Sequence, residues 1–178
     1  MRIISGKWRS RPLATAAGEG TRPTADRVRE TLFSMLLSRL GSFEGLAVLD
    51  LFAGSGALAF EALSRGAERA WLVEQDREAR AAITANIRAL AANATLIGHD
   101  ATALPVAPAA ADLIFLDPPY HSGLATPALA RARAQGWIQP STWISIETAR
   151  EENPEVPETT TETVRAVGKA ALHLLRPA

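Results

Sequence analysis

The sequence predicts an α/β fold in which a largely parallel sheet is covered by helices on both faces. Two observations lead to this prediction. Apolar runs typical of strands alternate with helical segments from residue 46 onward, and a glycine-rich turn joins the first strand to the first helix. The chain has 178 residues, which suits one domain with a substantial core. We therefore expect residues 1–178 to form one domain, with a basic extension and helix over 1–41 and a core over 46–178.

The segment before the core is predicted to be a hairpin-like entry followed by a helix. Residues 1–21 hold two short apolar patches and two glycines, and residues 22–41 show helical periodicity. Thr24 is the expected N-cap of this helix and Gly41 its expected end. Its apolar face comprises Val28, Leu32, Met35, Leu36 and Leu40.

The core is predicted to contain strands, helices and a closing hairpin. The strand-like segments are residues 46–52, 69–75, 94–100, 110–117 and 143–147. Helices are expected over 57–66 and 76–93, with Asp76 capping the second, and a hairpin over 161–177 turns at Gly168. Because strands alternate with helices, the strands are expected to be parallel and to end at one common edge, where such sheets bind ligands.

Composition and charge indicate where in the cell the protein acts and what class of partner it binds. The chain has no cysteine, so it has no disulfide and no cysteine nucleophile, and no apolar run approaches the ~18 residues of a membrane span. Its start lacks an apolar stretch of signal-peptide length, so we expect a cytoplasmic protein without membrane partners. The net charge is zero, yet residues 1–39, which include Arg9 and Arg11, carry a net charge of +5. This basic arm is interpreted either as a surface for phosphate groups or as a solvated face.

The turn "DLFAGSGALA" matches a dinucleotide-binding fingerprint, but one residue argues against that ligand. Gly54, Gly56 and Ala59 fit G-x-G-x-x-A, and Glu74 lies twenty residues after Gly54. Asp50, however, ends the strand beside the glycines, where a carboxylate would repel a pyrophosphate. It suits a ligand with an ammonium group instead.

S-adenosylmethionine is such a ligand, because it joins an adenosine to an amino-acid end and has no phosphate. Glu74 would accept hydrogen bonds from the ribose hydroxyls, and Asp100, at the end of the third strand, from the adenine amine. Each acid alone could equally be a helix cap or a solvated strand end. Three of them at successive strand ends around a glycine loop predict a cofactor site.

The stretch "DPPY", residues 117–120, follows the fourth predicted strand and is interpreted as the catalytic turn. Asp117 and the carbonyl of Pro118 could accept hydrogen bonds from an exocyclic amine of a nucleobase, which would free the nitrogen lone pair. Pro118 and Pro119 would stiffen the turn, and Tyr120 would stack on an unstacked base. The alternative is a rigid loop whose tyrosine covers the core.

These motifs together resemble a known family. "DLFAGSG", "VEQD", "GHDA" and "DPPY" resemble the successive motifs of class I amino-methyltransferases acting on nucleobases, and "RIISGKWRSRPL" and "RPTADRVRETLFSML" closely resemble the RsmD family. The resemblance implies a Rossmann-like class I methyltransferase fold with seven mostly parallel strands, the last one antiparallel. It implies methylation of N2 of one guanine in 16S rRNA, of the guanine 966 type, in an assembling small ribosomal subunit. S-adenosylmethionine would be converted to S-adenosylhomocysteine without a metal, by a protein expected to be a monomer.

The family's roles carry over to individual residues. The cofactor set is Asp50, Phe52, Ala53, Gly54, Gly56, Glu74, Gln75, Asp100, Ala101 and Asp117. The catalytic set is Asp117, Pro118, Pro119 and Tyr120. The residues expected at the RNA are Arg9, Arg11, Arg22, Thr24, Arg27 and Tyr120, although Thr24 could be only a helix cap and the arginines surface charges. Departures from the family pattern are Ser5 and Ser10, where glycine is expected, and Ala111, where a bulkier residue is expected.

Other functions remain open at this point. A "DPPY" turn also serves adenine-N6 and cytosine-N4 methylation of DNA or RNA. The glycine fingerprint leaves a nicotinamide-dependent oxidoreductase as a second class of enzyme. A third class is an RNA-binding assembly factor that keeps the cofactor fold without catalysis.

Overall fold

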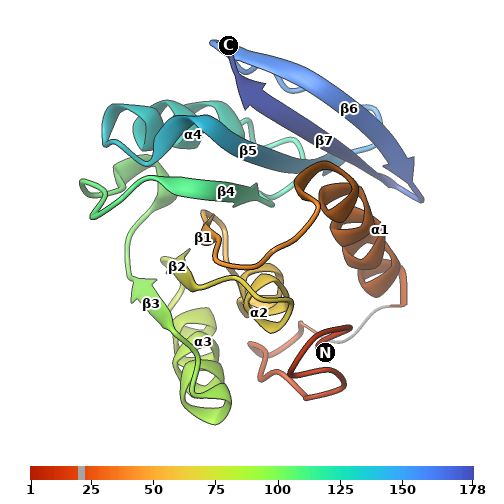
Figure 1. Ribbon diagram of the computed structural model, residues 1–178, viewed down its shortest axis with the longest axis vertical. Coiled ribbons are helices and arrows are strands. Elements are labelled where there is room, and N and C mark those ends of the chain that lie inside the picture. Colours follow the sequence, from red (N-terminus) through yellow and green to blue (C-terminus); the bar gives the residue numbers. More distant parts are fainter. Residues whose placement is uncertain (20–22) are drawn as a thin grey trace.

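A seven-stranded sheet organises the protein (Figure 1). The computed structural model describes residues 1–19 and 23–178. The strand order is β3-β2-β1-β4-β5-β7-β6, and all neighbouring pairs among β1 to β5 are parallel, whereas β7 is antiparallel to both β5 and β6. The strands are β1 Ala47–Asp50, β2 Arg69–Val73, β3 Ala94–Ile97, β4 Ala111–Leu116, β5 Ile138–Ala149, β6 Thr159–Val167 and β7 Ala170–Pro177. The predicted seven-stranded, mostly parallel sheet is confirmed.

Helices cover both faces of the sheet. The helices α1 Pro23–Leu40, α2 Ala57–Ser64 and α3 Arg77–Leu90 lie on one face, and α4 Ala125–Ala134 lies on the other with the short 3-10 helix η1 Ala101–Ala103 (Figure 1). Neighbouring residues of a strand point to opposite faces of the sheet. Val48 therefore packs in the hydrophobic core shared with α1, α2 and α3, and Leu49 packs in the core shared with α4. No helix in the described ranges combines the length and apolar character that crossing a bilayer requires.

Helix α1 confirms its predicted apolar face but not its predicted cap. The residues from Val28 to Leu36 on that face are buried, and Gly41 ends the helix with φ +74° and an N–H that donates to the carbonyl of Leu37. The helix already begins at Pro23, a residue type favoured at the first helical position. Thr24 therefore lies in the first turn, and its assignment as N-cap was wrong. Arg22 falls outside the described residues.

The region between β4 and β5 holds a helix that the sequence did not predict. Helix α4 buries mainly small side chains, among them Ala128 and Ala132, which give a weak periodic signal in an alanine-rich chain. Strand β5 is longer than the expected 143–147 and pairs with β4 and β7. Its central place in the sheet is what brings its carboxyl end beside the end of β4.

The N-terminal arm is a hairpin-like segment held on α2. Arg2 and Pro12 form an antiparallel bridge. The carboxylate of Glu61, which is fully buried in α2, accepts hydrogen bonds from the N–H groups of Ile4 and Ser5 at 2.8 and 3.0 Å. Ser10 has φ +67°, a left-handed conformation that glycine adopts without strain, so the expected glycine at this position has a structural reason.

Candidate active site

A cleft of about 730 Å³ opens at the carboxyl ends of β1, β2 and β4. Most of the residues predicted to bind a cofactor line it, although they are spread over more than sixty positions of the chain. These residues are Phe52, Ala53, Gly54, Glu74, Gln75, Asp100, Ala101 and Asp117. The sequence did not single out His99 and Glu147, which also line this cleft.

Glu74 organises the backbone at the centre of the cleft. One carboxylate oxygen accepts a hydrogen bond from the N–H of Gly54 at 2.8 Å, and the other accepts from the N–H of Asp76 at 2.8 Å. Asp76 in turn caps α3, as predicted, by accepting from the N–H of Ala79 at 2.9 Å. Glu74 thereby fixes the glycine loop after β1 relative to the start of α3.

Asp100 lies after β3 and caps η1 rather than ending the strand itself. Its Oδ1 accepts hydrogen bonds from the N–H and the hydroxyl of Thr102 at 2.8 and 2.9 Å. The residue is exposed toward the cleft, so the carboxylate retains capacity to accept from a ligand.

Asp50 is almost completely buried beneath the glycine loop, with 1% of its surface exposed. Among the described residues, neither of its carboxylate oxygens has a hydrogen-bond partner of good geometry. Burial raises its pKa to about 7, and the nearby charge of Glu74 adds to this, while the backbone N–H groups of Ala59 and Phe52 offset part of it. A buried acid without a close partner is costly, which marks Asp50 as a group kept for something other than stability.

Gly56 does not line the cleft, in contrast to Gly54. A methyl group added at Gly56 would lie 2.5 Å from the ring of Phe60 and 2.7 Å from Leu72, so this glycine lets α2 pack closely on β2. Both glycines have positive φ, but Gly54 has no atom other than Glu19 Oε1 within 4 Å of such a methyl group. Gly56 therefore has a packing role in the structure, and its predicted contact with the cofactor stays a prediction.

The "DPPY" turn joins the cleft to a second pocket. Asp117 borders the cleft, and Pro118, Pro119 and Tyr120 line both cavities. The Tyr120 hydroxyl donates a hydrogen bond to Oε1 of Glu147 at 2.8 Å, and 45% of the tyrosine remains exposed. The core is thus not covered by this tyrosine, which leaves its ring available for contact.

Asp117 and Glu147 form a coupled acidic pair at this turn. Asp117 is exposed where it faces the cleft, and it is surrounded by protein elsewhere. Partial removal from water raises the pKa of Asp117, and the charges of Glu147 and Asp50 raise it further. Burial also raises the pKa of Glu147, whereas the hydrogen bond from Tyr120 lowers it. Both carboxyl groups therefore have a raised pKa in the ligand-free protein, and the hydrogen bond from Tyr120 limits this effect at Glu147.

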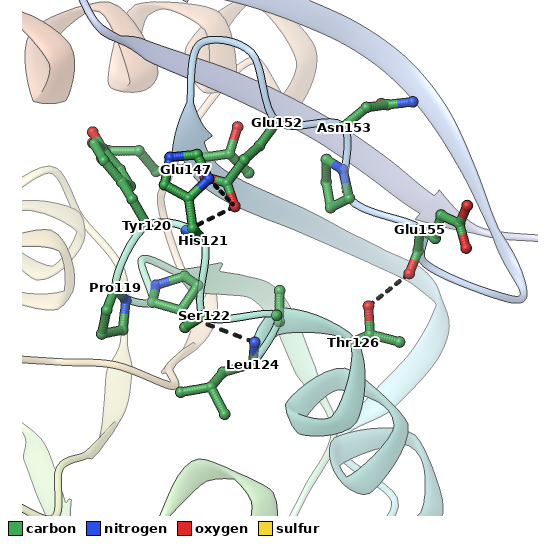
Figure 2. A pocket seen from close by; sticks show the side chains of 15 residues that line it. Pro119, Tyr120, His121, Ser122, Leu124, Thr126, Glu147, Glu152, Asn153 and Glu155 are labelled. Carbon is green, nitrogen blue, oxygen red and sulfur yellow. Dashed lines mark hydrogen bonds and ion pairs between the residues drawn. The ribbon is translucent and has the colours of Figure 1, made fainter.

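The second pocket has a volume of about 370 Å³ and lies between the "DPPY" turn, the start of α4 and the β5–β6 loop (Figure 2). Glu152 ties these parts together, because it accepts hydrogen bonds from the N–H of His121 at 2.8 Å and of Ala149 at 2.7 Å. Thr126 donates to the carbonyl of Glu155 at 2.6 Å on the far side. The pocket is therefore a built cavity with a defined wall rather than an open surface.

The residues predicted to meet RNA on the N-terminal side lie apart from both cavities. Arg9 is exposed, and Arg11 donates a hydrogen bond to the carbonyl of Ala89 at the end of α3, at 2.7 Å. Thr24 lies near the β6–β7 turn, and Arg27 is exposed on α1. None of these four lines either cavity.

The two cavities share an acidic character. Among the described residues, the two linings together include no lysine or arginine but five glutamates: Glu19, Glu74, Glu147, Glu152 and Glu155. No group of three or more His, Cys, Asp or Glu in the described ranges is arranged to hold a metal ion. A lining of this kind disfavours a pyrophosphate and favours ligands that present N–H groups or a positive charge.

Comparison with known proteins identifies the family. A family model described as Conserved hypothetical protein 95 matches residues 1–176. The chain is 38% identical over 164 residues to the ribosomal RNA small subunit methyltransferase D of Haemophilus influenzae, which covers 89% of this chain and 83% of the relative. It is 39% identical over 160 residues to the protein of the same name from Escherichia coli K12, and this match covers 88% of this chain and 79% of the relative. The chain belongs to the RsmD family.

Solved structures agree with this assignment. The structure of yhhF from Escherichia coli has a TM-score of 0.84 and 34% identity, with 99% of this chain and 97% of that chain covered. The 16S rRNA N2 G1207 methyltransferase RsmC of Thermus thermophilus, solved with AdoMet and guanosine, shares the fold. Its TM-score is 0.67 at 22% identity, and the match covers 91% of this chain and 45% of that chain. This RsmD-family chain is therefore a methyltransferase with the Rossmann-like class I fold, and a nicotinamide-dependent oxidoreductase is not supported.

The packing role of Gly56 predicts a large loss of stability on Gly56→Ala. The added methyl group meets Phe60 and Leu72 and the backbone has φ +85°, so we expect the free energy of unfolding to fall by about 2–4 kcal/mol. Gly41→Ala is the matched control, because Gly41 has φ +74° but open space around it, and should cost about 1 kcal/mol. Denaturant unfolding compares the two variants, and equal losses would contradict the packing role.

The raised pKa of Asp50 predicts that Asp50→Asn stabilises the folded protein increasingly as the pH rises. The folded state holds this proton up to about pH 7, whereas the unfolded chain releases it near its ordinary value, so wild type loses stability as pH rises between them. The stability advantage of the variant over wild type should therefore grow by roughly 2–3 kcal/mol from pH 5 to pH 8. Urea unfolding of the ligand-free proteins measures it, and parallel pH profiles would show that Asp50 does not titrate in this range.

Proposed function

We propose that this protein transfers a methyl group from S-adenosylmethionine to the exocyclic N2 of a guanine in 16S rRNA of the small ribosomal subunit, of the guanine 966 type. The observation that carries the proposal is the "DPPY" turn, which forms a common wall of the cleft at the sheet edge and of the second pocket. A cofactor in the first cavity and a base in the second would meet at Asp117. The names of the curated relatives support ribosomal RNA as the substrate.

The residues of the cleft fit S-adenosylmethionine. Asp50 does not itself line the cleft, but its buried carboxylate lies directly behind the lining residues Leu51 and Phe52 and would attract the ammonium end. Glu74 and Asp100 would accept from the ribose hydroxyls and the adenine amine. The described lining offers no cation for a phosphate-bearing cofactor. Phe52, Gln75 and Ala101 would complete the wall around the adenosine.

In the reaction, Asp117 would act on the amine. When bound, S-adenosylmethionine supplies the methyl group: the N2 lone pair forms the new N–C bond, sulfur keeps the electron pair of the broken S–C bond, and S-adenosylhomocysteine leaves. Asp117 and the carbonyl of Pro118 would accept hydrogen bonds from the N2 hydrogens and orient the lone pair toward the cofactor. The proton that N2 then loses would pass to the carboxyl pair of Asp117 and Glu147, whose raised pKa values suit that task.

The base would have to leave its stack to reach this position. The exposed ring of Tyr120 offers it a stacking surface in the second pocket, a contact worth roughly 1–3 kcal/mol for a single base. The basic arm with Arg9 and Arg11, together with Arg22, Thr24 and Arg27, would contact the rRNA. We propose a cytoplasmic protein that acts as a monomer on the small subunit or its assembly intermediate.

Asp117→Asn tests the proposed chemistry. Asparagine keeps the size but loses the charge and presents N–H donors to the amine, so we expect the turnover rate to fall at least 100-fold. Because Asp117 is proposed to act on the amine, binding of S-adenosylhomocysteine measured by calorimetry should change less than about threefold. The assay is transfer of a labelled methyl group to unmodified small subunits, and equal turnover by wild type and variant would contradict the role.

A further inference from the structure

Glu147 lies between the two cavities, although it belongs to no motif in the sequence. It follows Ile146, which pairs in register with Leu116, so Glu147 and Asp117 are the next residues on two adjacent parallel strands. Its carboxylate accepts from the Tyr120 hydroxyl and lines both the cleft and the second pocket. A base amine held at Asp117 would therefore have the Glu147 carboxylate beside it.

The position next to the amine is where the three amino-bearing bases differ. In guanine the amine at C2 is flanked by N1–H, a hydrogen-bond donor. In adenine and cytosine the amine is flanked on its Watson–Crick side by a ring nitrogen that is an acceptor. A carboxylate beside the amine attracts the donor and repels the acceptor.

The surroundings of Glu147 favour a group with many N–H donors. In the second pocket Glu147 is joined by Glu152, and the described lining holds no lysine or arginine. Although burial raises the pKa of Glu147, the hydrogen bond from Tyr120 favours its ionised, accepting form and offsets part of that effect. A phosphate would be repelled here, whereas the guanine edge presents donors at both N1 and N2.

We infer that Glu147 is the residue that selects guanine, by accepting a hydrogen bond from N1–H while Asp117 accepts from N2–H. This inference rests on the proposed function, because it places the base amine at Asp117. Glu147 contacts the base directly in this arrangement, and its hydrogen bond from Tyr120 holds the carboxylate beside the stacking ring. The second pocket of Figure 2 is then a guanine site.

The test replaces guanine by 2-aminopurine, which keeps the amine at C2 but has an acceptor at N1. Small subunits are reconstituted with 16S rRNA that carries either base, in a ligated synthetic segment, at the guanine that wild type methylates. Wild type should prefer guanine at least about tenfold in kcat/KM, as expected for a lost base-edge hydrogen bond combined with repulsion. In Glu147→Gln the amide can donate to N1, so the preference should fall at least about fivefold. Any contribution from guanine O6 is the same in both enzymes and cancels in this comparison.

Two variants separate selection from other roles. Glu155→Gln makes the same chemical change at the other end of the pocket and should keep the wild-type preference. Tyr120→Phe removes the hydroxyl that Glu147 accepts from, and should lower the rate but keep most of the preference. An unchanged preference in Glu147→Gln, or a loss in Tyr120→Phe as large as in Glu147→Gln, would overturn the inference.

The failure of this inference is distinct from the failure of the proposed function. If wild type forms N2-methylguanosine and Glu147→Gln keeps the same preference, only the role of Glu147 is wrong. If wild type forms no N2-methylguanosine on the guanine-containing subunit, the proposed function itself is wrong.

Discussion

Carboxylates are gathered at one edge of the sheet, and the described residues that line the two cavities there include no lysine or arginine. Asp50, Asp117 and Glu147 lie at or near the carboxyl ends of three neighbouring parallel strands. Burial raises the pKa of all three, and the charges of Glu147 and Asp50 raise that of Asp117 further. Such a cluster costs stability in the ligand-free protein. Ligands that bring positive charge or N–H groups to this edge would offset that cost, and the proposed cofactor and guanine both carry such groups.

The rest of the fold holds this edge in place. Gly56 allows α2 to pack directly on β2, and the two oxygens of Glu74 fix the glycine loop relative to α3. The N-terminal arm is fastened to the outer side of α2 by the buried Glu61, so the helix that follows the glycine loop is supported on both sides. On the other side of the site, Glu152 connects the "DPPY" turn to the end of β5. The cavities are thus bounded by interactions between segments far apart in the chain.

The sequence predicts those parts of the structure whose signals are local. Alternating strands and helices indicate the parallel sheet, and Asp76 and Gly41 mark helix ends by ordinary capping chemistry. Helix α4 was missed because its buried face is mostly alanine, which contrasts little with the residues around it. Thr24 was taken for a cap because threonine is a common cap, although the proline before it already occupies the first helical position.

Only some residues of the candidate site could likewise be predicted from the sequence. Residues next to a glycine loop or within "DPPY" were found, and most of them line the cleft. Glu147 was not found, because its meaning depends on the pairing of β4 with β5 and on a contact with Tyr120 from 27 positions away. The packing role of Gly56 was not predicted, because a fingerprint does not show whether a glycine faces a cavity or a neighbouring helix. Register and packing, which decide both cases, are properties of the folded chain.

The most direct test of the account is nucleoside mass spectrometry after the protein is incubated with S-adenosylmethionine. The substrates are unmodified small subunits, naked 16S rRNA and DNA, in separate reactions. We expect N2-methylguanosine from the ribosomal substrates and no methylated base from DNA. Methylated adenine or cytosine, or no product while the cofactor still binds, would contradict it.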